Sequence, residues 1–294
     1  YQNETGGLPT RNYTSGTFGS AEGLSGERMA DTILKENDTC YACSVRCKRV
    51  VETEYRGVKV DPLYGGAEYE TLSTFGSYCA IGDLQAVSLA HQICAQVGLD
   101  TISTGATIAF AMECFEKGIL SLADTGGIDL RFGDAGAMLD LLDKIVCREG
   151  LGDLLAHASA YAAERIGRGA EDLVVAVKNQ ELPAHMPQVK RSLAIVYAVN
   201  PFGADHQSSE HDPGYTPGAY DYSLRRLAEI GLTDPQDERV MNREKAKLAF
   251  KTMCTYSFMD SANLCQFVYG PSWQLIGPSE MARLVTAVTG WQLS

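Results

Sequence analysis

The sequence predicts a mainly α-helical protein built from two helical domains. Several segments carry apolar residues at the 3.6-residue helical spacing, and these segments begin after Asp or Asn and end at Gly. Asp172–Lys178 is the best candidate for a strand, and it is short. A length of 294 residues corresponds to two domains of roughly 150 residues each. We expect a first domain over 1–175 and a second over 176–294.

The expected helices have recognisable ends. Asp83 can cap a helix whose apolar positions continue to Val97, and Gly98 supplies a stop signal. Gly118 ends the next periodic segment, and Asp134 opens a third. The same patterns indicate helices over 84–97, 104–117, 135–148, 153–166 and 243–257, with a last one after Pro278.

Composition excludes several classes of protein. Hydrophobic residues make up 45% and charged residues 21%, which is typical of globular proteins and not of disordered chains. The formal net charge is −12, from 25 basic and 37 acidic residues, and such a surface repels phosphate backbones and anionic lipid. No apolar run approaches the 18 residues of a membrane span. We therefore expect neither nucleic-acid nor membrane partners.

The cysteines indicate a reducing compartment. There are nine, an odd number, and most are scattered along apparently helical segments. A disulfide scaffold shows a different, denser pattern, so we expect a cytoplasmic protein.

Three of the cysteines are clustered, in Cys40-Tyr-Ala-Cys43-Ser-Val-Arg-Cys47. Thiolates at this spacing can converge on one metal centre, and soft thiolates select zinc or an iron–sulfur cluster. Zinc sites usually add a second C-x2-C pair or a nearby His, and the sequence has no second pair. A [4Fe–4S] cluster needs a fourth thiolate, which would have to come from a distant cysteine. Both kinds of site remain open at this point.

Four motifs in order give the sequence a family resemblance. CYACSVRC, AEYETLSTFG, GLDTISTG and DSANLC span residues 40–265. Their order and spacing resemble the tungsten- and molybdopterin-dependent aldehyde ferredoxin oxidoreductases. The resemblance implies that this chain is a fragment covering most of the two helical domains, without the N-terminal β-rich domain that forms the base of the pterin site.

The resemblance also implies an electron path. Cys40, Cys43 and Cys47 match three ligands of a [4Fe–4S] cluster, and Cys265 at the end of DSANLC matches the fourth. In the family, electrons pass from this cluster to ferredoxin, which is therefore the implied protein partner. Whether the protein forms a homo-oligomer is left open.

The family holds a tungsten or molybdenum bis-pterin cofactor with two D-x-x-G-L-[DC] loops. The resemblance therefore implies that Asp100 and Asp260 bind the pterins. Ala95 stands where the first loop of the family begins with Asp, and Asn263 stands where the second has Gly. Asn tolerates the left-handed backbone conformation better than most residues. Asp100 can equally be the cap of the helix that follows it.

The catalytic residues that the resemblance implies are Glu70 and His206. Oxidising an aldehyde to an acid adds an oxygen from water and releases two electrons and protons. A carboxylate can take such a proton, and an imidazole can donate a hydrogen bond to the carbonyl oxygen. His185 is expected to line the same pocket, with a small aldehyde as substrate.

Two other functions fit the same motifs. Some family members reduce aromatic acyl thioesters instead of oxidising aldehydes. A different class is a non-catalytic helical module that carries electrons on its iron–sulfur cluster or holds a structural zinc ion. Iron, sulfide and pterin analysis would separate these classes from the enzyme.

Overall fold

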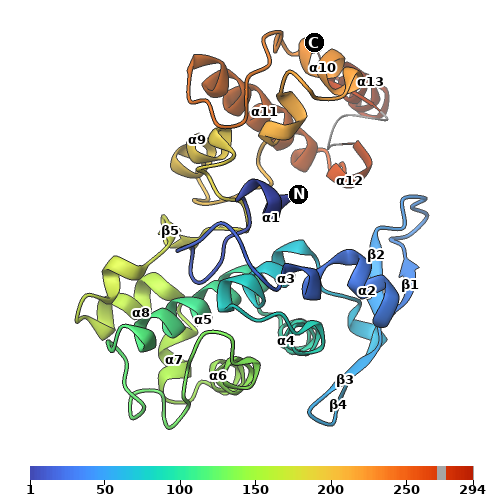
Figure 1. The fold of residues 1–294 in the computed structure, drawn as a ribbon. Helices are drawn as coiled ribbons and strands as arrows, with labels where there is room; N and C mark the ends of the chain where they lie inside the picture. Colours follow the sequence, from blue (N-terminus) through green and yellow to red (C-terminus); the bar gives the residue numbers. More distant parts are fainter. Residues whose placement is uncertain (270–275, 294) are drawn as a thin grey trace. The chain divides into compact units, whose positions relative to one another are not determined.

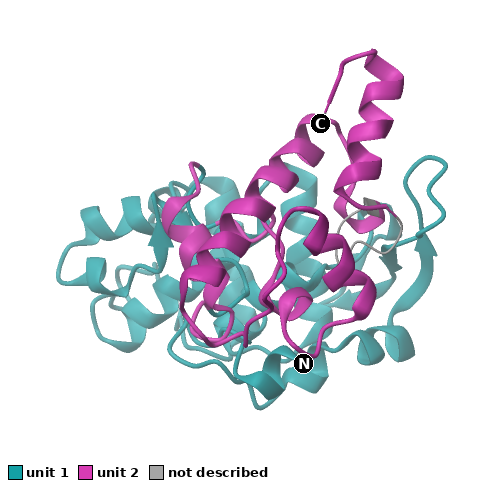
Figure 2. Ribbon diagram, turned by 90° about the horizontal axis from the view of Figure 1, so that it is seen from above, with its two compact units in different colours: residues 1–186, 202–204 teal, residues 187–201, 205–294 magenta. Residues whose placement is uncertain are grey.

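The computed structural model describes residues 1–269 and 276–293, and helices dominate it (Figure 1). The expected mainly α class is confirmed. The chain divides into two compact units (Figure 2). The first comprises Tyr1–Met186 with Phe202–Ala204, and the second comprises Pro187–Pro201 with the described residues from Asp205 onward.

The first unit contains eight of the described α-helices and three two-stranded antiparallel sheets. Its helices are α1 Gln2–Thr5, α2 Gly26–Thr32, α3 Tyr69–Thr74, α4 Leu84–Val97, α5 Thr101–Glu116, α6 Ala135–Cys147, α7 Leu151–Leu155 and α8 Ser159–Ile166. Its strands pair as β1 Leu34–Asp38 with β2 Lys48–Val51, β3 Thr53–Tyr55 with β4 Val58–Val60, and β5 Ala176–Val177 with β6 Gln180–Glu181. Short 3-10 helices lie at η1 Ala21–Leu24, η2 Pro62–Tyr64, η3 Ser77–Cys79 and η4 Ala170–Leu173.

Helix α4 has the predicted bounds because its caps form as expected. The Asp83 carboxylate accepts hydrogen bonds from the backbone N–H groups of Gln85 and Ala86, and Gly98 ends the helix at φ 76°. Helix α5 starts three residues before the predicted 104. Its cap is Asp100, whose Oδ2 accepts from the Ser103 N–H at 2.7 Å and allows the Thr- and Ser-rich first turn to be helical.

The single helix predicted over 153–166 is wrong, since the structure has α7 and α8 with a break between them. Ala158 adopts φ 72°, a conformation that no helix interior accepts. The first turn of α8 is held instead by Glu181, whose Oε1 accepts from the Ser159 N–H at 2.8 Å and hydroxyl at 2.6 Å. A partner 22 residues away in the sequence therefore decides where this helix begins.

The strand predicted over Asp172–Lys178 is also mostly wrong. Residues Ala170–Leu173 form the 3-10 helix η4, and only Ala176–Val177 pair with another strand. The β1–β2 and β3–β4 hairpins were not expected. The first of them pairs Asp38 with Lys48, so that the three clustered cysteines lie on the loop joining its strands.

The core of the first unit is a large apolar cluster to which the helices α4, α5 and α6 all contribute. Most side chains of α5 are buried in it, and α3 packs against α5. Gly105 permits that approach, since a Cβ at this position would lie 2.7 Å from the Cβ of Thr74. The close packing fixes α3, which carries Glu70.

The second unit has a smaller apolar cluster and a buried ion pair. Its α-helices are α9 Arg191–Val199, α10 Asp221–Glu229, α11 Arg243–Ser261, α12 Gln266–Tyr269 and α13 Pro278–Thr289, with the 3-10 helix η5 Asp212–Tyr215. Helix α11 starts at the predicted Arg243 and extends past the predicted end at residue 257. Lys245 on α11 pairs with Asp212 on η5, and both side chains are completely buried.

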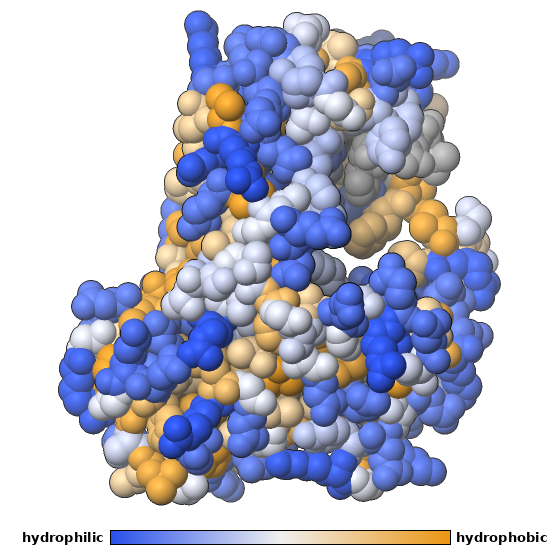
Figure 3. Space-filling view, viewed as in Figure 1, coloured by the Kyte–Doolittle hydropathy of each residue, from blue (hydrophilic) through white to orange (hydrophobic). Residues whose placement is uncertain are grey.

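Polar and apolar residues both reach the surface. The face in Figure 3 is mostly hydrophilic, with apolar residues scattered between polar ones. Among the described residues, no helix combines the length and the apolar character that crossing a bilayer requires.

Candidate active site

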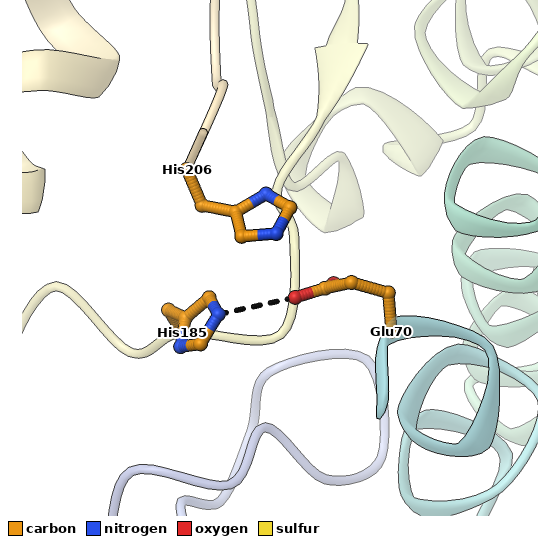
Figure 4. Close-up of side chains that lie close together, drawn as sticks. All are labelled: Glu70, His185 and His206. Atoms are coloured by element: carbon orange, nitrogen blue, oxygen red, sulfur yellow. Dashed lines mark ion pairs between the residues drawn. The ribbon is translucent and has the colours of Figure 1, made fainter. Parts of the chain in front are cut away.

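Glu70 lies in the first turn of α3 with its carboxylate largely buried, at 13% exposure. One oxygen, Oε2, accepts a hydrogen bond from the Ala184 N–H at 2.7 Å. The other, Oε1, lies 3.1 Å from Nε2 of His185, as the dashed line in Figure 4 shows. Both contacts come from one short segment, residues 182–186. A carboxylate held in this way is fixed in position while retaining the capacity to exchange a proton.

Tyrosine hydroxyls hold the 182–186 segment. Three consecutive backbone carbonyls of the segment each accept a hydrogen bond from a different tyrosine. Tyr78 donates to Leu182 at 2.9 Å, Tyr69 donates to Ala184 at 2.6 Å, and Tyr13 donates to Pro183. The segment therefore cannot shift without breaking three partly buried hydrogen bonds.

The tyrosines remain protonated donors. Burial raises the pKa of Tyr69 well above its ordinary value, and the negative charge of Glu70 raises it further. Burial raises the pKa of Tyr13 in the same direction, with a smaller contribution from Glu70. Both hydroxyls consequently keep their hydrogen at neutral pH.

His206 lies in the second unit, on the loop before η5, and is buried at 6% exposure. Its Nε2 is 2.8 Å from the Gln207 amide nitrogen, and its carbonyl oxygen is 2.8 Å from Nε2 of His211. Since Glu70 and His206 belong to different units, their convergence on one cavity stays a prediction.

The cysteine hairpin loop, residues 39–47, presents its thiols outward. Cys40 and Cys47 are exposed and Cys43 is half-buried, and none of them forms a disulfide. The Cys43 N–H donates to the Cys40 carbonyl at 3.1 Å, and Ala42 and Arg46 take left-handed conformations that turn the loop back on itself. Three unpaired thiols on one tightly turned loop fit three ligands of a thiolate-bound cluster.

The proposed fourth ligand, Cys265, is exposed and follows α11 in the second unit. Its approach to the other three cysteines is therefore also a prediction that stays open.

The two predicted pterin-binding aspartates lie at helix ends. Asp100 caps α5, as the alternative reading expected, and its side chain is exposed. Asp260 lies exposed in the last turn of α11. Asn263, which stands where the family has Gly, adopts φ 54°, so this position does require a left-handed backbone. The contacts of both carboxylates with a pterin remain predictions.

Sequence reasoning missed several residues around Glu70. His185 was expected to line the pocket, but its contact with Glu70 was not foreseen, nor was the role of Tyr13. Gln2 also reaches this site, with its amide nitrogen 3.4 Å from Nδ1 of His185. No sequence spacing connects residues 2, 13, 70 and 185, because only the tertiary fold brings them together.

Comparison with known proteins adds independent information to this geometry. The model of the family described as aldehyde ferredoxin oxidoreductase, domains 2 and 3, matches residues 1–294. The chain belongs to this family. The motif resemblance noted in the sequence is thereby confirmed, and with it the assignment of the chain to the helical domains.

Curated relatives in the family are tungsten-containing aldehyde ferredoxin oxidoreductases. The protein from Thermococcus kodakarensis is 34% identical over 294 residues, covering 99% of this chain and 44% of the relative. The protein from Pyrococcus furiosus is 33% identical, with the same coverage of each chain. The chain thus spans less than half the length of these relatives.

A solved structure shares the fold. The active-site complex BamBC of benzoyl coenzyme A reductase, in complex with 1,5-dienoyl-CoA, matches with a TM-score of 0.70 and 23% identity. The match covers 91% of this chain and 43% of that chain. At this identity the likeness concerns the fold alone.

Proposed function

We propose that this chain contributes to an enzyme that oxidises small aldehydes to carboxylic acids and passes the electrons through a [4Fe–4S] cluster to ferredoxin. The observation that carries the proposal is Glu70, a largely buried carboxylate in the family's AEYE motif. Its Oε2 accepts from the Ala184 N–H, and its Oε1 lies 3.1 Å from Nε2 of His185. Family membership and the names of the relatives support the substrate class and the partner. The free thiols fit a reducing, cytoplasmic setting.

The reaction converts an aldehyde and water into a carboxylic acid, two protons and two electrons. A tungsten or molybdenum bis-pterin, when bound, would supply the two-electron acceptor, and Asp100 and Asp260 are the residues proposed to hold it. Glu70 takes a proton from water as its oxygen is added to the carbonyl carbon. His206 donates a hydrogen bond to the carbonyl oxygen, which stabilises the negative charge that develops there.

The electrons leave one at a time by way of the cysteine loop. Cys40, Cys43 and Cys47 would hold the cluster together with Cys265. Arg46, Lys48 and Arg49 lie on or beside this loop, and their positive charge suits the approach of an acidic electron carrier to an otherwise acidic chain.

The decisive experiment replaces Glu70 in the full-length enzyme. Glu70→Gln keeps the size of the side chain but removes the proton acceptor, so we expect turnover to fall by about 10²-fold or more. Tungsten and iron contents should not change, because Glu70 is not proposed as a ligand. Glu68→Gln, two residues earlier on an exposed side chain paired with Arg49, is the matched control and should retain activity.

Wild-type turnover of Glu70→Gln with full metal content would refute the catalytic assignment, and loss of metal would make Glu70 structural. Assaying an aldehyde panel beside an aromatic acyl thioester identifies the substrate class. Iron and acid-labile sulfide without pterin would instead identify an electron-carrying module, and zinc without iron would identify a structural metal site.

A further inference from the structure

We propose that His185 is a positioning residue that fixes the Glu70 carboxylate for proton transfer, and that Gln2 sets the tautomer of its imidazole. The inference rests on the proposed role of Glu70 and adds to it a mechanism by which the chain orients this group. His185 is 8% exposed, and its ring lies against that of Tyr69 with centroids 5.3 Å apart. The imidazole is thus packed inside the site and shielded from solvent.

The contacts of the two ring nitrogens define the tautomer. Nδ1 lies 3.4 Å from the side-chain nitrogen of Gln2. With the Gln2 amide in this orientation its nitrogen donates, which makes Nδ1 the accepting, unprotonated nitrogen. The hydrogen of a neutral imidazole then resides on Nε2, which is the nitrogen 3.1 Å from Oε1 of Glu70. We infer that Gln2 thereby keeps the hydrogen of His185 on the ring nitrogen nearest the carboxylate.

The backbone of the 182–186 segment prevents the imidazole from swinging away. Besides the three tyrosine hydroxyls, the Met186 N–H donates to the Gly7 carbonyl at 3.4 Å, on the far side of His185 from Ala184. Both neighbours of His185 in the sequence are therefore tied down, Ala184 by Glu70 and Tyr69, and Met186 by Gly7.

A strained turn aims one of those tyrosines. Arg11, Asn12 and Tyr13 have φ values of 49°, 47° and 67°. Three consecutive left-handed residues without glycine are unfavourable, and such strain persists where the surrounding structure enforces it, often at functional sites. The Asn12 amide enforces it here, donating to Glu113 Oε2 at 2.7 Å and to the Leu173 carbonyl at 2.9 Å. The turn places Tyr13 on the Pro183 carbonyl.

The direct test is nuclear magnetic resonance of the protein labelled with ¹⁵N histidine. The sequence has five histidines, and the His185 signals are those that disappear in His185→Gln. We expect Nε2 of His185 to resonate as a protonated nitrogen and Nδ1 as an unprotonated one. In Gln2→Glu the new carboxylate accepts a hydrogen bond, so Nδ1 should become protonated. A wild-type His185 that is protonated at Nδ1, or at both nitrogens, would overturn the tautomer assignment.

Activity of the full-length enzyme tests the positioning role. His185→Leu removes the donor, and we expect turnover to fall by about 10²-fold, the scale of a misplaced catalytic group. His185→Gln can present an amide N–H near the former Nε2 and should restore most of the turnover. The exposed His157, replaced in His157→Gln, is the control and should have no effect.

The double variant separates this inference from the proposed function. If His185 acts through Glu70, His185→Leu should lower turnover little further in a Glu70→Gln background. Normal turnover of His185→Leu beside an inactive Glu70→Gln would refute the positioning role and leave the proposed function intact. Normal turnover of Glu70→Gln would refute the proposed function whatever the tautomer of His185.

Discussion

Two buried carboxylates, one in each unit, are held in contrasting ways. In the first unit, Glu181 is 3% exposed, and its contacts are neutral donors: the hydroxyls of Ser103, Thr107 and Ser159 and the Ser159 N–H. In the second, Asp212 is paired with the completely buried ammonium of Lys245, in addition to contacts from the N–H and hydroxyl of Ser192. A cation cancels the charge of a carboxylate and confines it to a structural role. Neutral donors orient the group and leave its charge in place.

Glu70 follows the pattern of the first unit. The Ala184 N–H from which Glu70 accepts is a neutral donor, and so is the inferred N–H of His185. Donors of this kind orient a carboxylate and leave its charge in place. The contrast therefore separates a carboxylate whose charge is neutralised by a cation, Asp212, from Glu181 and Glu70, which accept from neutral donors.

The largest effect should follow from breaking the ion pair. Lys245→Met leaves Asp212 buried without its cation, and we expect a loss of about 3–5 kcal/mol in the free energy of unfolding. Chemical denaturation followed by circular dichroism would measure it. Lys247→Met, on the same helix but with an exposed ammonium paired to Glu244, should cost at most about 1 kcal/mol. Equal losses in the two variants would contradict the structural role of the buried pair.

A smaller effect should follow from neutralising Glu181. In Glu181→Gln one oxygen becomes an amide that donates rather than accepts, so part of the hydroxyl network loses its acceptor. Because the Ser and Thr hydroxyls can rotate, we expect the free energy of unfolding to fall by about 1–3 kcal/mol, which is less than for Lys245→Met. The break between α7 and α8 should also loosen, which amide hydrogen exchange at Ser159 would detect. A loss of stability larger than that of Lys245→Met would contradict the expectation that the buried ion pair contributes more than the hydrogen bonds of Glu181.

These contacts also show how far sequence reasoning reaches. Both predicted ends of helix α4 were correct, because the residues that determine them, the Asp83 cap and the Gly98 stop, are adjacent to the helix in the chain. The break at Ala158 was missed, because Glu181 determines it from a distant segment. The hairpin around the cysteines was missed as well, since its strands are short and polar and lack an alternating pattern.

In the candidate site, too, only residues that belong to contiguous motifs could be predicted from the sequence. Glu70, His206 and the cysteines could be selected because they lie in contiguous motifs that resemble a family. The contacts that support Glu70 could not be predicted, although His185 was expected in the pocket. Tyr13, His185 and Gln2 lie in no such motif and meet only after the 182–186 segment has folded against α3. Local signals predict local structure and motif residues, while the groups that orient a catalytic side chain depend on the tertiary fold.

The smallest effect concerns a third kind of carboxylate, one that has neither a cation nor a set of neutral donors. Desolvation raises the pKa of Asp143 on α6 above its ordinary value, and the nearby charge of Asp140 raises it further. The folded protein therefore binds a proton here more tightly than the unfolded chain does, and the charged form disfavours folding. This unfavourable contribution is fully present at neutral pH and disappears as the pH falls through the raised pKa to the ordinary one.

Asp143→Asn should accordingly raise the melting temperature slightly at pH 7, and the difference from wild type should shrink as the pH falls toward 4. Because Asp143 is exposed, solvent screens its charge. The gain in the free energy of unfolding should therefore stay within about 0.5 kcal/mol, as is usual for surface substitutions. Thermal unfolding at a series of pH values measures it. In an Asp140→Asn background part of the repulsion is already gone, so the gain at pH 7 should be smaller. A gain that grew on acidification would show that the charged form of Asp143 stabilises the fold, as we expect for Glu181 and Asp212.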